Sequence, residues 1–281
     1  MHTPRQLIHR LEPLCGTILL ALMLLTQAAC QNRYDRGMDA IAEQRFEEAR
    51  QSARIGKKEE PKNPRYDLLM AQSYVKEAEA MTQAMSSNDS QPPMELKKVQ
   101  QRYKKALPHA QAAFDSGELT ADAGRILGKI HWELENPIDA VDTWRAARQA
   151  DPTAILDGDY LQALRTALGR VTFFEDHIKA LELRHELQEF VDTHQSLVQK
   201  TSPETQQSIA ENLSKESFRK NREAVATQYA TSKRTEDAIA LYSQLIEDFP
   251  EESRYHYEKG SLLLLTGKDE EAVKSFEKYA T

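Results

Sequence analysis

The chain has 281 residues, of which 40% are apolar and 29% are charged, and its formal net charge is −7. This content of charged side chains excludes a protein with many membrane-spanning segments. Two cysteines are too few for a disulfide framework, and a mildly acidic chain without a basic block offers no electrostatic footprint for nucleic acid.

The first thirty residues differ in composition from the rest of the chain. Arg5 and Arg10 precede an apolar run at residues 14–25. That run is short for a transmembrane helix, which needs about 20 apolar residues, and it has the length of the core of a secretory signal. We therefore expect residues 1–29 to be a signal peptide and the chain to be exported.

The end of this segment carries a candidate lipidation site. Ala28 and Ala29 stand directly before Cys30, which resembles the lipobox of bacterial lipoprotein precursors. The resemblance implies cleavage before Cys30 and lipidation of its thiol, and Gln31 is compatible with transfer to the periplasmic face of the outer membrane. Gln27 stands where a lipobox usually has Leu, so ordinary cleavage or an uncleaved anchor are the open alternatives.

The remainder of the chain repeats its pattern every 34 residues, which is the length of one pair of short helices. The clearest unit places Leu127 and Gly128 in a first helix, Ala140 and Trp144 in a second, and Pro152 after it. This pattern resembles the tetratricopeptide repeat. The resemblance implies an all-α fold, a right-handed α-solenoid of about five to six helix pairs.

Small residues recur at matching places in the two helices of a unit. A spacing of twelve residues separates Gly37 from Ala49, and the same spacing separates Gly260 from Ala272. Because a small side chain lets the neighbouring helix approach closely, we expect such positions to pack the repeats. The predicted packing positions are Gly37, Ala49, Ala71, Ala106, Leu127, Gly128, Ala140, Trp144, Pro152, Ala226, Ala238, Tyr242, Pro250, Gly260, Ala272 and Phe276.

The second repeat contains an insertion. Ala71 lies one period after Gly37, but the alanine of its second helix is Ala106, which precedes Ala140 by one period. The extra residues contain a loop-like stretch near 84–96, rich in Ser, Asn and Pro and flanked by helix formers. We expect both helices of this repeat to be longer than usual, with the loop serving either as part of a binding face or only as a tolerated surface loop.

Three segments follow the signal peptide in the predicted organisation. Residues 30–192 form an N-terminal array, residues 193–217 form a polar spacer helix, and residues 218–281 form a C-terminal pair of repeats. Ser202 and Pro203 supply an N-cap and a proline at the first helical position within the spacer.

Sequence motifs of catalytic sites are missing. The chain has no glycine-rich phosphate loop, no G-x-S-x-G and no H-E-x-x-H. Glu182 and His185 share one helix face, but a di-iron site needs a second such motif and further carboxylates. We expect no enzyme, no catalytic residue, no metal and no cofactor.

A candidate binding groove comes from the resemblance to tetratricopeptide repeats, in which first helices line a concave face that takes peptides or partner helices. The corresponding positions here combine basic and aromatic side chains, which favour an acidic or C-terminal carboxylate ligand with an apolar anchor. A solvated helix face is the alternative. The predicted groove residues are Arg65, Gln72, Lys76, Arg125, Lys129 and Trp132.

The resemblance to bacterial repeat lipoproteins implies a non-enzymatic scaffold on the outer membrane that assists an envelope complex such as a secretin, pilus, outer-membrane barrel or cell-wall machinery. Its expected partners are envelope proteins or peptide segments in the groove and the membrane through the lipid at Cys30, with no nucleic acid. The apolar face of residues 269–281 also allows self-association. The alternatives are an accessory subunit of a periplasmic cell-wall enzyme, or an unrecognised hydrolase domain in the irregular segment 153–217.

Overall fold

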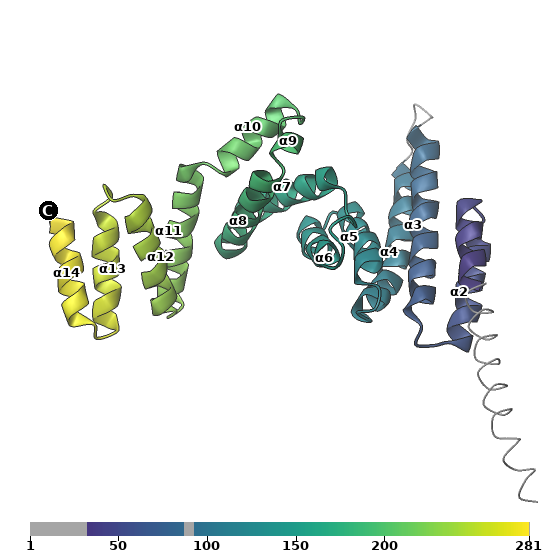
Figure 1. Ribbon diagram of the computed structural model, residues 1–281, viewed down its shortest axis with the longest axis horizontal. Helices are drawn as coiled ribbons and strands as arrows, with labels where there is room; N and C mark the ends of the chain where they lie inside the picture. Colours follow the sequence, from purple (N-terminus) through teal and green to yellow (C-terminus); the bar gives the residue numbers. More distant parts are fainter. Residues whose placement is uncertain (1–32, 87–92, 281) are drawn as a thin grey trace, which may run out of the picture. The chain divides into compact units, whose positions relative to one another are not determined.

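The computed structural model describes residues 33–86 and 93–280, and within them every regular element is a helix (Figure 1). The predicted signal peptide, Cys30 and positions 87–92 of the predicted loop lie outside the described residues. No helix in the described part of the chain has both the length and the apolar character needed to cross a membrane. The predicted all-α fold class of stacked helix pairs is confirmed.

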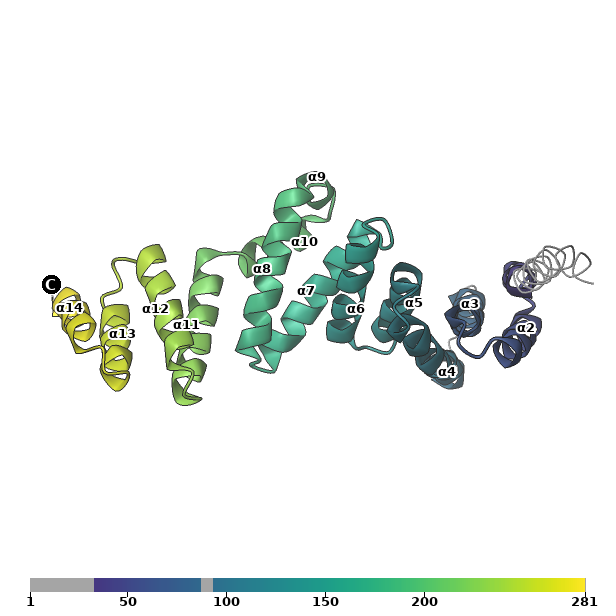
Figure 2. The ribbon, with the colours of Figure 1, turned by 60° about the horizontal axis from the view of Figure 1, so that its bottom comes forward.

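The chain divides into two compact units, and the first ends at Ile155. Its described part consists of three helix pairs, in which successive helices pack side by side (Figure 2). The pairs are residues 33–42 with α2 (Phe46–Glu59), α3 (Pro64–Ser86) with α4 (Pro93–Asp115), and α5 (Thr120–Glu133) with α6 (Pro137–Ala150). In each pair we call the first helix the A helix and the second the B helix.

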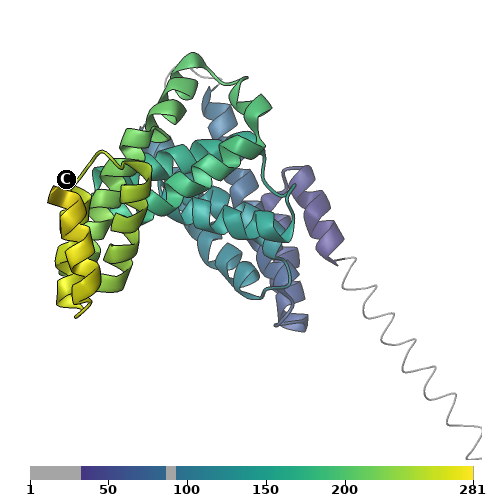
Figure 3. The ribbon, with the colours of Figure 1, turned by 60° about the vertical axis from the view of Figure 1, so that its left-hand side comes forward.

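The second unit begins at Leu156 and contains three further pairs. Helices α11 to α14 pack in sequence as neighbours, as Figure 3 shows in green and yellow. The elements are α7 (Asp157–Phe173), α8 (His177–Thr193), α9 (Gln195–Val198), α10 (Pro203–Asn212), α11 (Lys215–Thr231), α12 (Thr235–Asp248), α13 (Arg254–Leu265) and α14 (Asp269–Ala280).

The segment predicted as one spacer helix over residues 193–217 contains two short helices, α9 and α10, and then the start of α11. The break falls at Ser202, whose backbone is extended with φ −64° and ψ 154°. Its hydroxyl accepts a hydrogen bond from the backbone N–H of Thr205 at 3.3 Å, and Pro203 has no N–H with which to continue a preceding helix. The same residues that start α10 therefore prevent a single continuous helix.

The insertion in the second repeat lengthens both of its helices, as the sequence predicts. Helices α3 and α4 have 23 residues each, whereas α5 and α6 in the next repeat have 14 each.

Five of the turns between A and B helices share one backbone geometry. Each contains one residue with φ between 58° and 73°, and only Gly267 among them is glycine. The residue after it donates its N–H to a carbonyl in the last turn of the A helix, as Asn136 does to His131 O at 2.8 Å. This repeated left-handed turn reverses the chain at Gln44, Glu135, Glu175, Lys233 and Gly267.

The small residues predicted to pack the repeats lie at close approaches between helices. A Cβ atom on Gly128 would stand 2.3 Å from Cδ1 of Trp144, and one on Gly37 would stand 2.4 Å from Cδ2 of Leu69. The predicted alanines, from Ala49 to Ala272, are fully buried. Pro152 and Pro250 are instead exposed, each two residues beyond the last residue of a B helix, so they end helices and do not fill the core.

Candidate functional site

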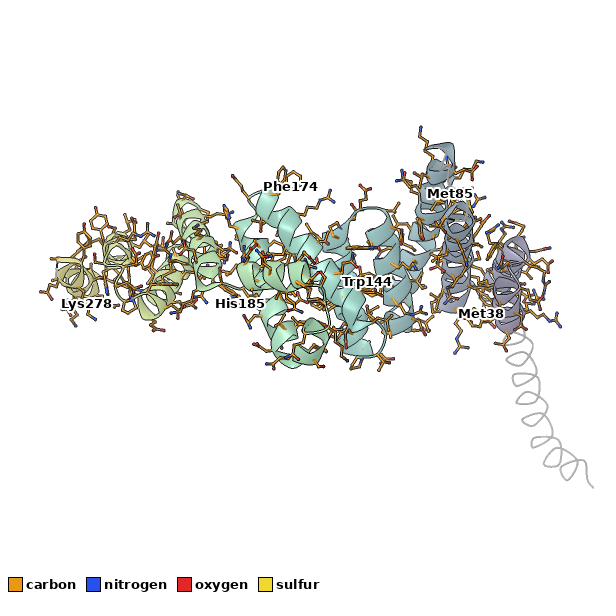
Figure 4. The ribbon with its side chains drawn as sticks, turned by 90° about the horizontal axis from the view of Figure 1, so that it is seen from above. Met38, Met85, Trp144, Phe174, His185 and Lys278 are labelled. Atoms are coloured by element: carbon orange, nitrogen blue, oxygen red, sulfur yellow. The ribbon has the colours of Figure 1, made fainter. Side chains whose placement is uncertain are left out.

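A pocket of about 250 Å³ lies on the A helices of the first unit. It is built from residues 33–42, α3 and α5, so three successive repeats contribute to it (Met38 is labelled in Figure 4). The contributing positions on α3 are three or four residues apart and therefore share one helix face. The lining residues are Met38, Ile41, Gln72, Val75, Lys76, Glu79, Arg125, Ile126 and Lys129.

Four of the six predicted groove residues line this pocket: Gln72, Lys76, Arg125 and Lys129. Arg65 does not line it; its exposed guanidinium lies 6.0 Å from the ring of Tyr34. The position of Arg65 at the first turn of α3 places it about two turns from Gln72 along the helix.

Trp132 was predicted as an apolar anchor in the groove, but it is not part of the pocket lining. Its ring stacks against the ring of Trp144 on α6, with centroids 6.4 Å apart. Trp144 in turn donates its indole N–H to the backbone oxygen of Arg125 at 3.2 Å (Trp144 is labelled in Figure 4). Trp132 therefore contacts α6, the B helix of its own repeat, and the apolar lining of the pocket comes from aliphatic side chains instead.

A carboxylate that the sequence analysis did not single out lies at the centre of the charged side of the pocket. Glu79 accepts a hydrogen bond from Lys76 at 2.8 Å, and its other oxygen lies 2.5 Å from the ammonium of Lys129. Burial on its own raises the pKa of Glu79, but the hydrogen bonds from Lys129 and Lys76 outweigh it and hold the pKa below its usual value. Glu79 is therefore ionised near neutral pH, pairs with both lysines and offsets one of their two positive charges.

The third cation of the pocket is held much less firmly. Arg125 has its nearest carboxylate partner in Asp122, at 3.8 Å, and both side chains are about half exposed or more. An exposed ion pair of this length contributes little to stability, so the guanidinium retains its capacity to bind another carboxylate.

One polar atom of the pocket lacks a partner among the described residues. The side-chain oxygen of Gln72 is buried and accepts no hydrogen bond. A buried acceptor without a donor costs about 1–3 kcal/mol, and this oxygen can meet a ligand N–H only after the Gln72 side chain changes its rotamer.

The sequence pair Glu182 and His185 does not form part of a metal site. Glu182 faces Lys179 at 3.4 Å, while the ring of His185 lies 5.2 Å from the ring of Phe218. Burial and the nearby charge of Arg222 both lower the pKa of His185. Across the described residues there is no group of three or more His, Cys, Asp or Glu side chains placed to hold a metal ion.

A second hollow, of about 290 Å³, lies in the second unit against α12, α13 and α14. Its lining mixes three lysines and His256 with Glu247 and Glu271. Burial lowers the pKa of His256, and the charges of Lys278 and Lys259 lower it further. This hollow has charges of both signs and lies outside the A-helix face on which the predicted groove residues stand.

The sequence analysis missed one charged residue of the pocket and its four aliphatic residues: Glu79, Met38, Ile41, Val75 and Ile126. Glu79 could have been found, because it stands three residues after Lys76 and seven after Gln72, on the same helix face. Met38 and Ile41 carry no chemical signal of binding in the sequence, since aliphatic residues of a repeat are equally expected in its core.

Comparison with known proteins supports the repeat assignment. The family model of the tetratricopeptide repeat matches residues 97–155 and 226–281. No curated protein matches the chain by sequence.

Several solved structures share the helical fold at low similarity. A tetratricopeptide repeat protein from Parabacteroides merdae is 12% identical with a TM-score of 0.36, covering 89% of this chain and 78% of its own. MamA is 15% identical with a TM-score of 0.26, covering 68% and 94%. YrrB, described as a tetratricopeptide repeat protein with an unusual peptide-binding site, is 17% identical with a TM-score of 0.24, covering 72% and 91%. The family match rests on the sequence itself and covers residues 97–155 and 226–281, which are similar to tetratricopeptide repeats.

Proposed function

We propose that this chain is a non-enzymatic scaffold whose A-helix pocket binds a segment of a protein of the bacterial envelope. The observation that carries the proposal is the pocket itself, which brings Gln72, Lys76, Arg125 and Lys129 from two different A helices to one place. A helix face that only contacts solvent would not combine these polar side chains with an apolar lining. Tetratricopeptide repeats in two stretches of the chain support an interaction role.

The proposed location follows from the N-terminal sequence. Lipidation of Cys30 would hold the protein at the periplasmic face of the outer membrane, and residue 33 already begins the first helix of the described fold. Met38 and Ile41 of that helix line the pocket, and they follow Cys30 by only eight and eleven residues in the sequence. We therefore propose a role beside a membrane-embedded complex, of which a secretin, a pilus, an outer-membrane barrel and cell-wall machinery are examples.

A triple variant with Gln72→Ala, Arg125→Ala and Lys129→Ala should lose its partner in intact cells. The substitutions remove the unpaired acceptor, the accessible guanidinium and one of the two lysines at Glu79, while the helices keep good helix formers. Truncation of the polar groups that contact a ligand typically reduces affinity by about ten-fold or more for each important contact. The measurement is chemical crosslinking in cells, followed by affinity capture and identification of the attached proteins.

The matched control carries Arg36→Ala, Gln51→Ala and Lys62→Ala, which change the same residue types at exposed positions of the same unit. We expect this control to capture the same envelope proteins as the unmodified chain. If the pocket variant and the control capture the same set in equal amounts, the pocket is not the binding site.

A further inference from the structure

We propose that Glu79 sets the ligand preference of the pocket, which selects a segment with one large apolar side chain beside a single carboxylate and disfavours runs of acidic residues. This inference rests on the proposed function, because it names the chemistry of the segment that the same pocket binds. It refines the sequence-based expectation of a basic groove, since that expectation counted the cations of the groove without the carboxylate that pairs with two of them.

Two cations of the pocket already pair with a carboxylate of the protein. Glu79 lies 2.8 Å from Lys76 and 2.5 Å from Lys129, with one oxygen on each ammonium. Its side chain is only 29% exposed, so the three charges interact through a medium less polar than water. An acidic residue of a ligand placed there would meet Glu79 and would have to displace it.

The third cation of the pocket, Arg125, does not pair with Glu79. Arg125 is 47% exposed and has only the long contact to Asp122, at 3.8 Å. A guanidinium can bind a carboxylate through two parallel hydrogen bonds, and this geometry is stronger than an exposed contact of that length. The pocket therefore has a place for one ligand carboxylate, at Arg125.

The rest of the pocket suits an uncharged part of the ligand. The pocket of about 250 Å³ exceeds the roughly 150 Å³ that is sufficient to hold a benzene molecule, so one large side chain fits. The aliphatic contacts come from Met38, Ile41, Val75 and Ile126.

The test is a selection from displayed random peptides, with free and blocked C-termini, against the unmodified protein and its Glu79→Gln variant. We expect the unmodified protein to enrich peptides with one acidic residue next to a large apolar residue. Glutamine keeps the size of the side chain and can still accept from one lysine, but it removes the negative charge. The variant should therefore enrich peptides with several acidic residues.

Two fluorescein-labelled peptides give the effect a size. One carries a Leu-Glu pair and the other carries four consecutive Glu, each within a Gly and Ser decapeptide. We expect Glu79→Gln to tighten binding of the four-Glu peptide by roughly ten-fold, as loss of one repulsive charge in a partly screened site predicts. Binding of the Leu-Glu peptide should change by less than about three-fold, since its carboxylate pairs with Arg125. Glu95→Gln is the matched control, because Glu95 forms a similar 3.0 Å pair with Lys98 outside the pocket.

The outcomes separate the inference from the proposed function. If neither protein enriches any peptide and neither labelled peptide binds, the pocket is not a peptide site and both proposals fail. If the unmodified protein enriches peptides but Glu79→Gln enriches the same ones, the role of Glu79 is overturned while the binding function stands. Thermal unfolding of both variants checks that each is folded.

Discussion

Gly128→Ala is expected to lower the free energy of unfolding of the first unit by about 3 kcal/mol, at the upper end of the usual cost of overpacking a core. The added Cβ would stand 2.3 Å from Cδ1 and 2.4 Å from Nε1 of Trp144, far inside van der Waals contact. Trp144 is buried and holds the Arg125 carbonyl, so its ring cannot move away without loss of that hydrogen bond. The measurement is urea unfolding followed by tryptophan fluorescence, because both tryptophans of the chain lie in this unit.

The control for this prediction is the same substitution at Gly169. This residue is also in an A helix, α7, but a Cβ there would meet nothing within 4 Å. Gly169→Ala should raise the free energy of unfolding of the second unit by up to about 1 kcal/mol, the difference in helix propensity between the two residues. Because Gly169 lies in the second unit and both tryptophans lie in the first, this control is followed by circular dichroism. If both substitutions change stability by the same amount and sign, the close approach of Gly128 and Trp144 does not decide the packing of this repeat.

Arg184→Met is expected to cost the second unit about 3 kcal/mol, because two acceptors would lose their donor in a buried place at about 1–3 kcal/mol each. The guanidinium of Arg184 is 6% exposed; it donates to Asn221 Oδ1 at 3.2 Å and to the backbone oxygen of Asn212. Asn221 in turn donates to the backbone oxygen of His177 at 2.7 Å. This network joins α8 to α11 and to the end of α10, and burial without a carboxylate partner lowers the pKa of the guanidinium.

Two optical signals separate this effect from one on the first unit. Circular dichroism follows helices of both units, whereas tryptophan fluorescence reports only on the first. We expect Arg184→Met to shift the dichroism transition to lower urea and to leave the fluorescence transition in place. Arg234→Met is the control: Arg234 pairs with Asp237 at 2.7 Å, both side chains are about half exposed, and its loss should cost less than about 1 kcal/mol. Equal effects of the two substitutions would contradict a structural role for the Arg184 network.

The repeat architecture could be predicted from the sequence because each unit has the same local requirement. Gly128, Ala140 and Trp144 must pack together within one repeat. The fixed period of the sequence places residues with the same packing role in the other repeats. The long pair α3 and α4 followed from the insertion, and the start of α10 followed from Ser202 and Pro203. These features depend on residues that are close in sequence or at a fixed spacing.

Features that depend on contacts between distant residues could not be predicted in the same way. Arg184 and Asn221 are 37 residues apart, outside the period of the repeat, and nothing in either residue marks it as a partner of the other. The left-handed residue of four A–B turns is Gln, Glu or Lys, types that give no signal for that backbone conformation.

The sequence predicted which helices form the candidate site better than it predicted the contacts between their side chains. The groove positions carried over from the repeat pattern brought Gln72 and Arg125 to one pocket, because the A helices of successive repeats are neighbours. The pattern could not show that Trp132 stacks on Trp144. It also could not show that Glu79 pairs with two of the expected cations, Lys76 and Lys129. Both depend on rotamers and on neighbouring helices, which spacing alone does not determine.

The most direct test of the central claim is photocrosslinking in living cells from a benzoylphenylalanine placed at position 76. Lys76 lines the pocket and is 56% exposed, so the probe faces the site without replacing a core residue. The account predicts a crosslink to one defined segment of an envelope protein, lost when Arg125→Ala is added and absent when the probe replaces exposed Lys104 on α4. Identical crosslinks from positions 76 and 104, or a crosslink unaffected by Arg125→Ala, would contradict it.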